Sequence, residues 1–138
     1  MCPKKYLQQI KKCEDQIDNK IAEVSKLREM ATSITSTLKE DVVQTSGSGD
    51  KLGEAVSKIL DLENEINAEI DKLVDIKKEI MGVIDALNEP HSTLLYKRYF
   101  QFKKWEEIAI EMNYSYRQIT RMHGRALQKV SEFLLCEV

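Results

Sequence analysis

The chain has 138 residues, of which 42% are hydrophobic and 32% are charged, and its formal net charge is −2. This length argues against a large multidomain enzyme, and this composition excludes a wholly disordered chain. Only 5 Gly and 2 Pro are present, which disfavours a turn-rich β-sandwich and favours long helices. The composition therefore predicts an all-α protein.

Cysteine usage and the N-terminal residues indicate a cellular compartment. Cys2, Cys13 and Cys136 are three in number, without a Cys-x-x-Cys spacing, which is typical of reduced thiols rather than of a disulfide framework or a zinc finger. The first residues lack the apolar stretch of a signal peptide, and no apolar run is long enough to span a membrane. We therefore expect a cytoplasmic protein that makes no membrane contact.

Charge and aromatic residues divide the chain near Pro90. Residues 1–90 hold 13 Lys/Arg and 18 Asp/Glu, whereas residues 91–138 hold 8 and 5. Eight of the nine aromatic residues lie after residue 90. Because proline ends a helix and disfavours the helical conformation in the residue before it, the boundary falls there. We predict an acidic part over residues 1–89 and a basic, aromatic part over residues 90–138.

The acidic part carries two heptad patterns. Nearly all core positions of both patterns are apolar, which predicts a coiled coil of two helices. The first pattern occupies Tyr6, Ile10, Cys13, Ile17, Lys20, Val24, Leu27, Ala31, Ile34 and Leu38. The second occupies Leu52, Ala55, Ile59, Leu62, Ile66, Glu69, Leu73, Ile76, Ile80, Val83 and Leu87. A Ser/Gly break at about residues 45–50 separates them, and Asp50 is the expected N-cap of the second helix.

Two topologies satisfy these heptads: an antiparallel hairpin within one chain, and an assembly of helices from two chains. Matching the core layers of the two patterns favours the hairpin, because it centres the turn between Ser46 and Gly47. The same register places the two polar core residues, Lys20 and Glu69, in adjacent layers. We therefore predict that they form an ion pair that helps to fix the register. A homodimer through the coiled coil stays open, since two hairpins can also combine into a four-helix bundle.

The basic part contains three apolar-periodic runs, over residues 92–100, 105–112 and 115–135. The last two are separated by only Asn113 and Tyr114. Asparagine tolerates the left-handed backbone conformation that a tight turn between helices requires. A short helix, a tight turn and a longer basic helix indicate a helix-turn-helix.

The start of the last helix has its own signal. Ser115 is followed three residues later by Gln118, which is the spacing of a capping box. Within this helix Ile119, Met122 and Ala126 are expected to face inward. Gly124 interrupts the helix at a cost of up to about 1 kcal/mol, which suggests close packing or a close approach to DNA.

These residues resemble a known family. The stretches that carry the resemblance are Leu94-Leu95-Tyr96-Lys97-Arg98-Tyr99, Trp105-Glu106-Glu107-Ile108-Ala109, Ser115-Tyr116-Arg117-Gln118-Ile119 and Arg125-Ala126-Leu127-Gln128-Lys129-Val130. They are similar to region 4 of bacterial sigma factors. The chain resembles the small sigma-region-4-like proteins of Firmicute phages and prophages, near the RinA and ArpU types of late transcription regulator. The resemblance implies a promoter-binding module that acts with host RNA polymerase, near the nucleoid.

The exposed face of the last helix supplies the candidate DNA contacts. Arginine can donate two hydrogen bonds to guanine, and each such pair contributes about 1–3 kcal/mol of discrimination. Lysines, including Lys97, contact the phosphates, so they raise the affinity for DNA without distinguishing one sequence from another. The full candidate set is Tyr116, Arg117, Gln118, Thr120, Arg121, Arg125, Gln128, Lys129, Lys103 and Lys104.

The sequence gives less support to other functions. His91 and His123 are far apart and have no Cys/Asp cluster at metal-ligand spacing, so we expect neither a metal nor a cofactor. We expect no enzymatic activity, because no nucleophile–base set or phosphate loop is present. Trp105 is expected to pack rather than to stack on bases. Two alternatives to a transcription regulator remain: a small-terminase-like factor that marks phage DNA for packaging, and a coiled-coil module that binds RNA polymerase or another protein without reading DNA.

Overall fold

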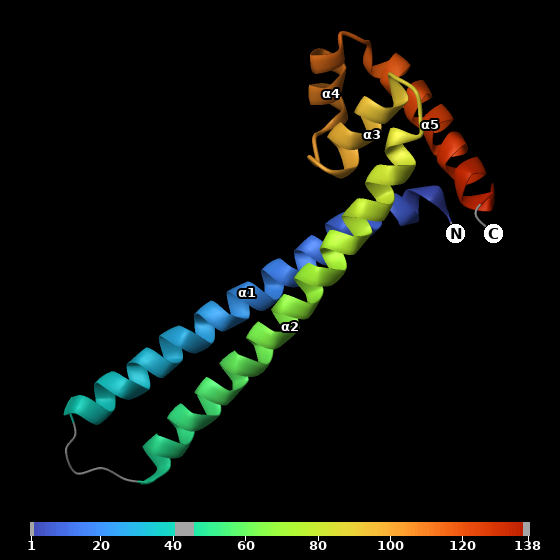
Figure 1. Cartoon of the computed structure of the whole chain (residues 1–138). Coiled ribbons are helices and arrows are strands. Elements are labelled where there is room, and N and C mark those ends of the chain that lie inside the picture. The colour runs from blue at the N-terminus through green and yellow to red at the C-terminus, as the bar shows by residue number, and fades with distance from the viewer. Residues whose placement is uncertain (1, 41–45, 137–138) are drawn as a thin grey trace. The chain divides into compact units, whose positions relative to one another are not determined.

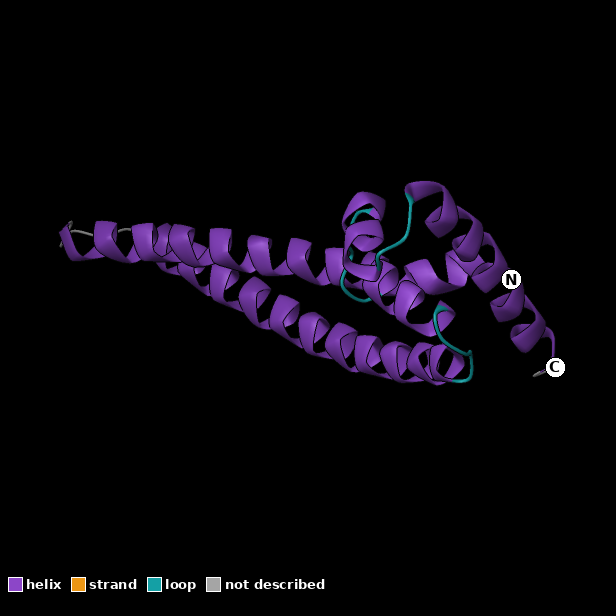
Figure 2. Ribbon diagram, turned by 90° about the horizontal axis from the view of Figure 1, so that it is seen from above, coloured by secondary structure: helices purple, strands orange, loops and turns teal. Residues whose placement is uncertain are grey.

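The computed structural model describes residues 2–40 and 46–136, and the side chains within residues 2–33 and 50–135. Every regular element in these ranges is a helix, which confirms the all-α prediction (Figures 1 and 2). The helices are α1 (Pro3–Glu40), α2 (Ser46–Asp85), α3 (His91–Tyr99), α4 (Trp105–Met112) and α5 (Tyr116–Cys136).

Contacts between residues divide the chain into two compact units. The five-helix unit consists of Met1–Glu14 and Leu73–Val138, so it joins the start of α1 and the end of α2 to α3, α4 and α5. The two-helix unit consists of Asp15–Lys72. The sequence boundary at Pro90 lies inside the five-helix unit. It coincides with a break between helices, since α2 ends at Asp85 and α3 begins at His91.

In the two-helix unit, α1 and α2 run side by side in opposite directions (Figure 1). Ile17, Val24, Leu27 and Ala55 are buried between them. The remaining described heptad core positions of this unit are half-buried, so the apolar pattern predicts which face of each helix is covered. The side chains of Ile34 and Leu38, which belong to the predicted seam, lie outside the described residues.

Among the described residues of this unit, Lys20 and Arg28 of α1 form ion pairs with carboxylates of α2. The Nζ atom of Lys20 lies 3.6 Å from Oε1 of Glu69, which confirms the predicted pair, and 3.8 Å from Oε2 of Glu65. Arg28 forms an ion pair with Glu63. From Lys20 to Arg28 the position on α1 moves towards the C-terminus while the partner on α2 moves towards the N-terminus, as antiparallel helices require.

The start of α2 differs from the prediction. The helix begins at Ser46, so Asp50 lies within it and is not its N-cap. The Ser/Gly run 46–49 is helical, although serine and glycine favour turns. The first four N–H groups of a helix have no intrahelical acceptor, which lowers the cost of weak helix formers in the first turn. Residue 45 of the expected break lies outside the described residues.

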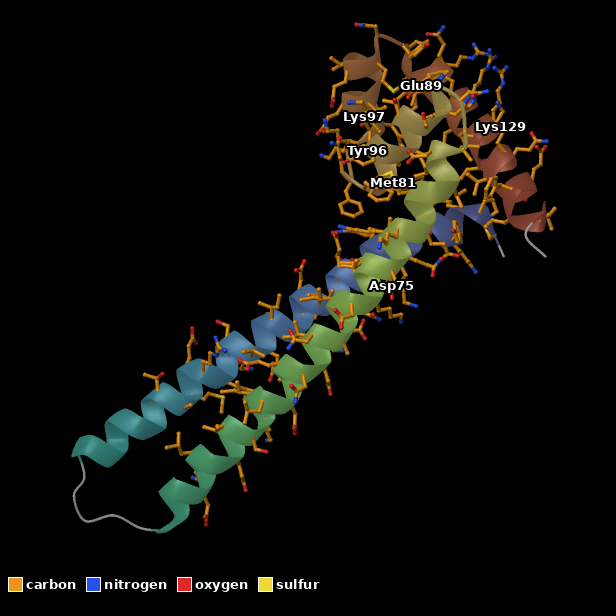
Figure 3. The ribbon with its side chains drawn as sticks, in the orientation of Figure 1. Asp75, Met81, Glu89, Tyr96, Lys97 and Lys129 are labelled. Atoms are coloured by element: carbon orange, nitrogen blue, oxygen red, sulfur yellow. The ribbon has the colours of Figure 1, made fainter. Side chains whose placement is uncertain are left out.

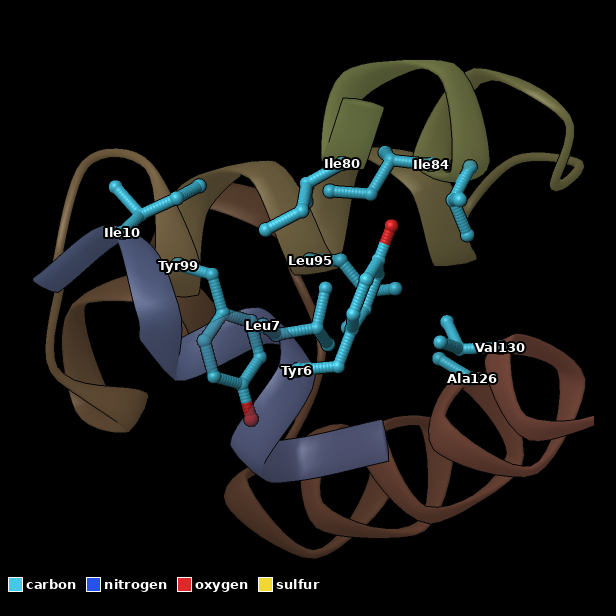
Figure 4. Packing of buried hydrophobic residues seen from close by; sticks show 10 residues of the cluster. Tyr6, Leu7, Ile10, Ile80, Ile84, Leu95, Tyr99, Ala126 and Val130 are labelled. Carbon is cyan, nitrogen blue, oxygen red and sulfur yellow. The ribbon is translucent and has the colours of Figure 1, made fainter. Parts of the chain in front are cut away.

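The core of the five-helix unit draws on four helices. Tyr6, Leu7 and Ile10 of α1 are buried with Ile80, Val83 and Ile84 of α2, Leu95 and Tyr99 of α3, and Ala126 and Val130 of α5 (Figure 4). Burying an aliphatic side chain of this size contributes about 1.5–3 kcal/mol. The first turns of α1 are therefore part of the same hydrophobic core as α5.

Candidate nucleic-acid interface

The turn between α4 and α5 is built by Asn113. This residue adopts the left-handed conformation, with φ 62° and ψ 40°, as the sequence predicted. Its backbone N–H donates to the carbonyl of Ile110 at 3.3 Å, and that of Tyr114 donates to Ala109 at 3.0 Å. These bonds satisfy carbonyls at the end of α4 and let the chain reverse within a few residues.

The capping box at the start of α5 is confirmed. The backbone N–H of Gln118 donates to Oγ of Ser115 at 3.1 Å, and the backbone N–H of Ser115 donates to Oε1 of Gln118 at 2.9 Å. Both bonds satisfy donors that a helix start otherwise leaves unpaired. The amide oxygen of Gln118 is thus used within the protein, which leaves its amide NH₂ group for an external partner.

A second hydrophobic cluster sets the rotation of α5. Leu94, Ile108, Ala109, Ile119 and Met122 are buried together, and Trp105 and Met112 pack against them. Because Ile119 and Met122 face this cluster and Ala126 and Val130 face the larger core, the opposite side of α5 faces outward. The predicted inward positions of α5 are therefore confirmed.

The outward side of α5 carries most of the candidate DNA contacts. Eight of the ten predicted residues lie on this helix and all eight are exposed, with Tyr116 at 52%. They are Tyr116, Arg117, Gln118, Thr120, Arg121, Arg125, Gln128 and Lys129. The hydroxyl of Thr120 donates to the carbonyl of Arg117 at 2.9 Å.

The charges of Arg125 and Lys129 act on a histidine at the start of α3. Burial lowers the pKa of His91, and the charges of Lys129 and Arg125 lower it further. Figure 3 shows Lys129 on α5, and Tyr96 and Lys97 on α3.

Lys103 and Lys104 precede α4, and they differ in exposure and in ion pairing. Lys104 is exposed at the N-cap position of α4. The Nζ atom of Lys103 lies 2.6 Å from Oε1 of Glu111, and Lys97 binds the same oxygen at 2.7 Å. These two lysines hold the pKa of the Glu111 carboxyl below its usual value. Glu111 therefore offsets part of the positive charge at this end of the surface.

Aromatic side chains of α3 and α4 pack against His123 of α5. The hydroxyl of Tyr99 is 2.8 Å from Nε2 of His123, and the rings of Trp105 and His123 are 4.5 Å apart. The guanidinium of Arg98 lies 4.3 Å from the centre of the Trp105 ring and donates to the carbonyl of Lys103 at 2.9 Å. Trp105 is thus half-buried in protein contacts, in agreement with the packing role expected for it.

The close packing suggested for Gly124 is wrong. A Cβ atom at this position would meet no heavy atom within 4 Å, and the residue is exposed. It is one helical turn from Arg121 and Gln128, on the outward side of α5. Close approach of DNA to this backbone stays a prediction.

Sequence reasoning missed the contribution of the N-terminus. The five-helix unit includes Lys4, Lys5, Lys11 and Lys12, and holds 14 Lys/Arg against 10 Asp/Glu, a net of +4. The two-helix unit holds 7 against 13, a net of −6. Leu7 was the available signal: it lies outside the heptad core positions, so its apolar side chain indicates a second covered face.

Comparison with family models, with curated proteins and with solved structures finds no match to this chain. In the described part of the chain, no group of three or more His, Cys, Asp or Glu residues is arranged to hold a metal ion. None of the described helices is both long enough and apolar enough to cross a membrane.

Proposed function

We propose that the protein is a sequence-specific DNA-binding transcription regulator of the phage or prophage type, without enzymatic activity. In this proposal α3, α4 and α5 form a sigma-region-4-like helix-turn-helix, and α1 and α2 form a coiled-coil hairpin. The observation that carries it is the outward side of α5, where exposed polar and basic side chains follow a capped helix start and a tight turn.

The residues of α5 divide by the part of the DNA they would contact. A recognition helix places its N-terminal residues in the major groove. Arg117 and Arg121 are the guanine-reading candidates, because a guanidinium can donate to O6 and N7 together. Tyr116 and Thr120 suit a thymine methyl or a phosphate. Arg125, Gln128 and Lys129 lie further along the helix, and with Lys103 and Lys104 they suit the sugar–phosphate backbone.

The division of charge supports binding through one unit. Phosphates attract the five-helix unit, whose net charge is +4, and repel the two-helix unit, whose net charge is −6. An acidic helical pair would therefore limit non-specific DNA binding and stay available for protein contacts. We propose host RNA polymerase and a second copy of the chain as its partners, in the bacterial cytoplasm at the nucleoid.

The decisive experiment measures binding to double-stranded fragments of the source genome around this gene, at two salt concentrations. The test variant is Arg117→Ala/Arg121→Ala. The control is Lys51→Ala/Lys58→Ala, which removes the same charge from exposed positions of α2 in the two-helix unit. We expect wild type and control to select the same fragment, and the arginine variant to lose that selection.

Three results are informative. Loss of selection in the arginine variant, with residual salt-sensitive binding, supports base reading by α5. Equal loss in the control indicates only a charge effect and contradicts the assignment of these residues. Absence of any binding by wild type at low salt rejects autonomous DNA recognition, and a protein partner such as RNA polymerase then becomes the main hypothesis.

A further inference from the structure

The first turns of α1 have an unusual charge for a helix start. Residues 1–13 contain four lysines and no acidic residue. Pro3 is the first helical residue, and no acidic side chain lies in the first turn. The N-terminus of a helix carries partial positive charge, so Lys4 and Lys5 are placed where cations are unfavourable, by about 0.3–1 kcal/mol each. Residues that lower the stability of the helix in which they lie are often there for function, so Lys4 and Lys5 are candidates for a binding role.

The same turns are fixed against α5. Tyr6, Leu7 and Ile10 are between 0 and 4% exposed and share a core with Ala126 and Val130 of α5 (Figure 4). The side of α1 away from this core is therefore held in a defined position within the five-helix unit.

The outward side of these turns carries hydrogen-bond donors in helical spacing. Lys5, Gln8 and Lys12 lie three and four residues apart, and with Gln9 they line one open surface depression. The row from Lys5 to Lys12 is about 10 Å long, which matches roughly three phosphates along one DNA strand. Gln9 also donates to the carbonyl of Tyr6 at 2.9 Å, so it serves partly to hold the helix.

These lysines are available to a ligand. Lys4, Lys5 and Lys12 are exposed, and they form no ion pair with any residue in the part of the chain that the structure describes. Lys4 lies in the same turn as Tyr6 and Leu7, which pack in one core with Ala126 and Val130 of α5. Its charge also contributes to the lowered pKa of His123 on α5.

We propose that the first three turns of α1 form a second phosphate-contacting surface, through Lys4, Lys5, Gln8 and Lys12, for the same DNA that α5 reads. This inference rests on the proposed function. The surface makes no base contacts, so it raises affinity for all DNA sequences alike and leaves discrimination to α5. It also gives the unfavourable lysines at the start of α1 a role.

The test variant is Lys4→Gln/Lys5→Gln/Lys12→Gln, because glutamine keeps a similar side-chain length and helix propensity without the charge. The matched control is Lys26→Gln/Lys58→Gln/Lys72→Gln, which changes net charge equally at exposed positions of the two-helix unit. Binding to the selected fragment and to an unrelated fragment is measured over a range of salt concentrations. Thermal unfolding followed by circular dichroism checks the fold of each variant.

Each phosphate neutralised contributes about −0.9 to the slope of log K against log salt. We expect the test variant to reduce the steepness of that slope by about 2–3, to weaken both fragments by the same factor, and to unfold at a temperature no lower than wild type. We expect the control to keep the wild-type slope.

The two proposals fail in different ways. If wild-type binding depends on Arg117 and Arg121 but the slope of the test variant equals that of wild type, this surface does not contact DNA and the proposed function stands. The surface is rejected in the same way if the control variant lowers the slope as much as the test variant does. If wild type binds neither fragment at low salt, both proposals are rejected.

Discussion

At the scale of single residues, packing within the protein does not explain the glycine at position 124, whereas DNA binding would. Nothing in the described structure occupies the space a methyl group would need, and its backbone does not have a positive φ. Alanine is more favourable than glycine inside a helix by about 0.8–1.0 kcal/mol. The glycine therefore weakens α5, and the compensation we propose is close approach of the DNA backbone to this side of the helix.

We predict that Gly124→Ala raises the free energy of unfolding by up to about 1 kcal/mol and lowers DNA affinity. Gly82→Ala is the matched control, because Gly82 is also exposed, helical and free of neighbours within 4 Å, but lies on α2. Urea unfolding and fragment binding are measured for both. The idea is wrong if Gly124→Ala binds DNA as tightly as Gly82→Ala does.

His123 is a second residue whose environment has a measurable consequence. Burial, followed by the positive charges of Arg98 and Lys4, lowers the pKa of His123 from 6.5 to about 4. Nε2 of the ring is hydrogen-bonded to the hydroxyl of Tyr99, and the ring tautomer decides which of the two groups donates. In the unfolded chain the imidazole binds a proton at higher pH than in the folded chain. The contribution to stability is therefore complete above about pH 6.5 and is lost as the pH falls towards 4.

We predict that the free energy of unfolding of wild type falls between pH 7.5 and pH 5, and that His123→Gln loses less over the same interval. Other shifted groups, including His91, Glu89 and Glu111, are common to both proteins and cancel in the comparison. Urea unfolding followed by circular dichroism at the two pH values gives the difference. Equal losses in the two proteins would show that His123 does not titrate in this way.

At the scale of helices, short sequence signals correctly predicted where helices begin and end. Proline at 90, the left-handed Asn113 and the Ser115–Gln118 capping box each act within a few residues, and the ends of α3, α4 and α5 were predicted within one residue. The start of α2 was not predicted correctly. The preference of residues 46–49 for a turn is weak, and these residues instead extend a helix of 40 residues. The place of α1 in the core was also missed, because an apolar Leu7 outside the heptad positions indicates a second covered face but does not identify the distant helices that cover it.

The pair formed by Lys20 and Glu69 tests whether polar residues fix the register of α1 against α2. Oε2 of Glu69 is buried and has no hydrogen-bond partner among the described residues, while Oε1 lies 3.6 Å from Lys20. Removal of Lys20 would leave this carboxylate without its nearest cation. Removal of both groups would leave an apolar layer, which is often neutral or stabilising.

We predict that Lys20→Leu destabilises the protein, whereas Lys20→Leu/Glu69→Leu restores most of the loss, with a coupling energy of about 0.5–1 kcal/mol. Thermal and urea unfolding of the two single variants and the double variant complete the cycle. Additive effects would contradict the coupling. Lys20 also lies 3.8 Å from Glu65, so Glu65→Gln is measured in parallel to separate the two carboxylates.

At the scale of the whole molecule, the two units have opposite net charge. The acidic two-helix unit also exposes large aliphatic side chains. On α2 these are Val56, Leu60 and Ile70, at 45, 55 and 41% exposed. Exposed apolar side chains that recur along one helix indicate a protein contact, and a coiled-coil pair often completes its core with a second pair. This supports the proposed homodimer.

We predict that wild type is a dimer and that Leu60→Gln/Ile70→Gln raises its dissociation constant by roughly tenfold or more, because about 1.4 kcal/mol of lost apolar burial corresponds to tenfold. The control Ser57→Gln/Asn64→Gln changes exposed polar residues of the same helix. Sedimentation velocity over a range of concentrations measures the change. A dimer would bind two half-sites about one helical turn, or a multiple of it, apart, so loss of the dimer should also reduce selection of paired over single half-sites. A monomeric wild type, or equal dissociation in both variants, would exclude this surface as the dimer contact.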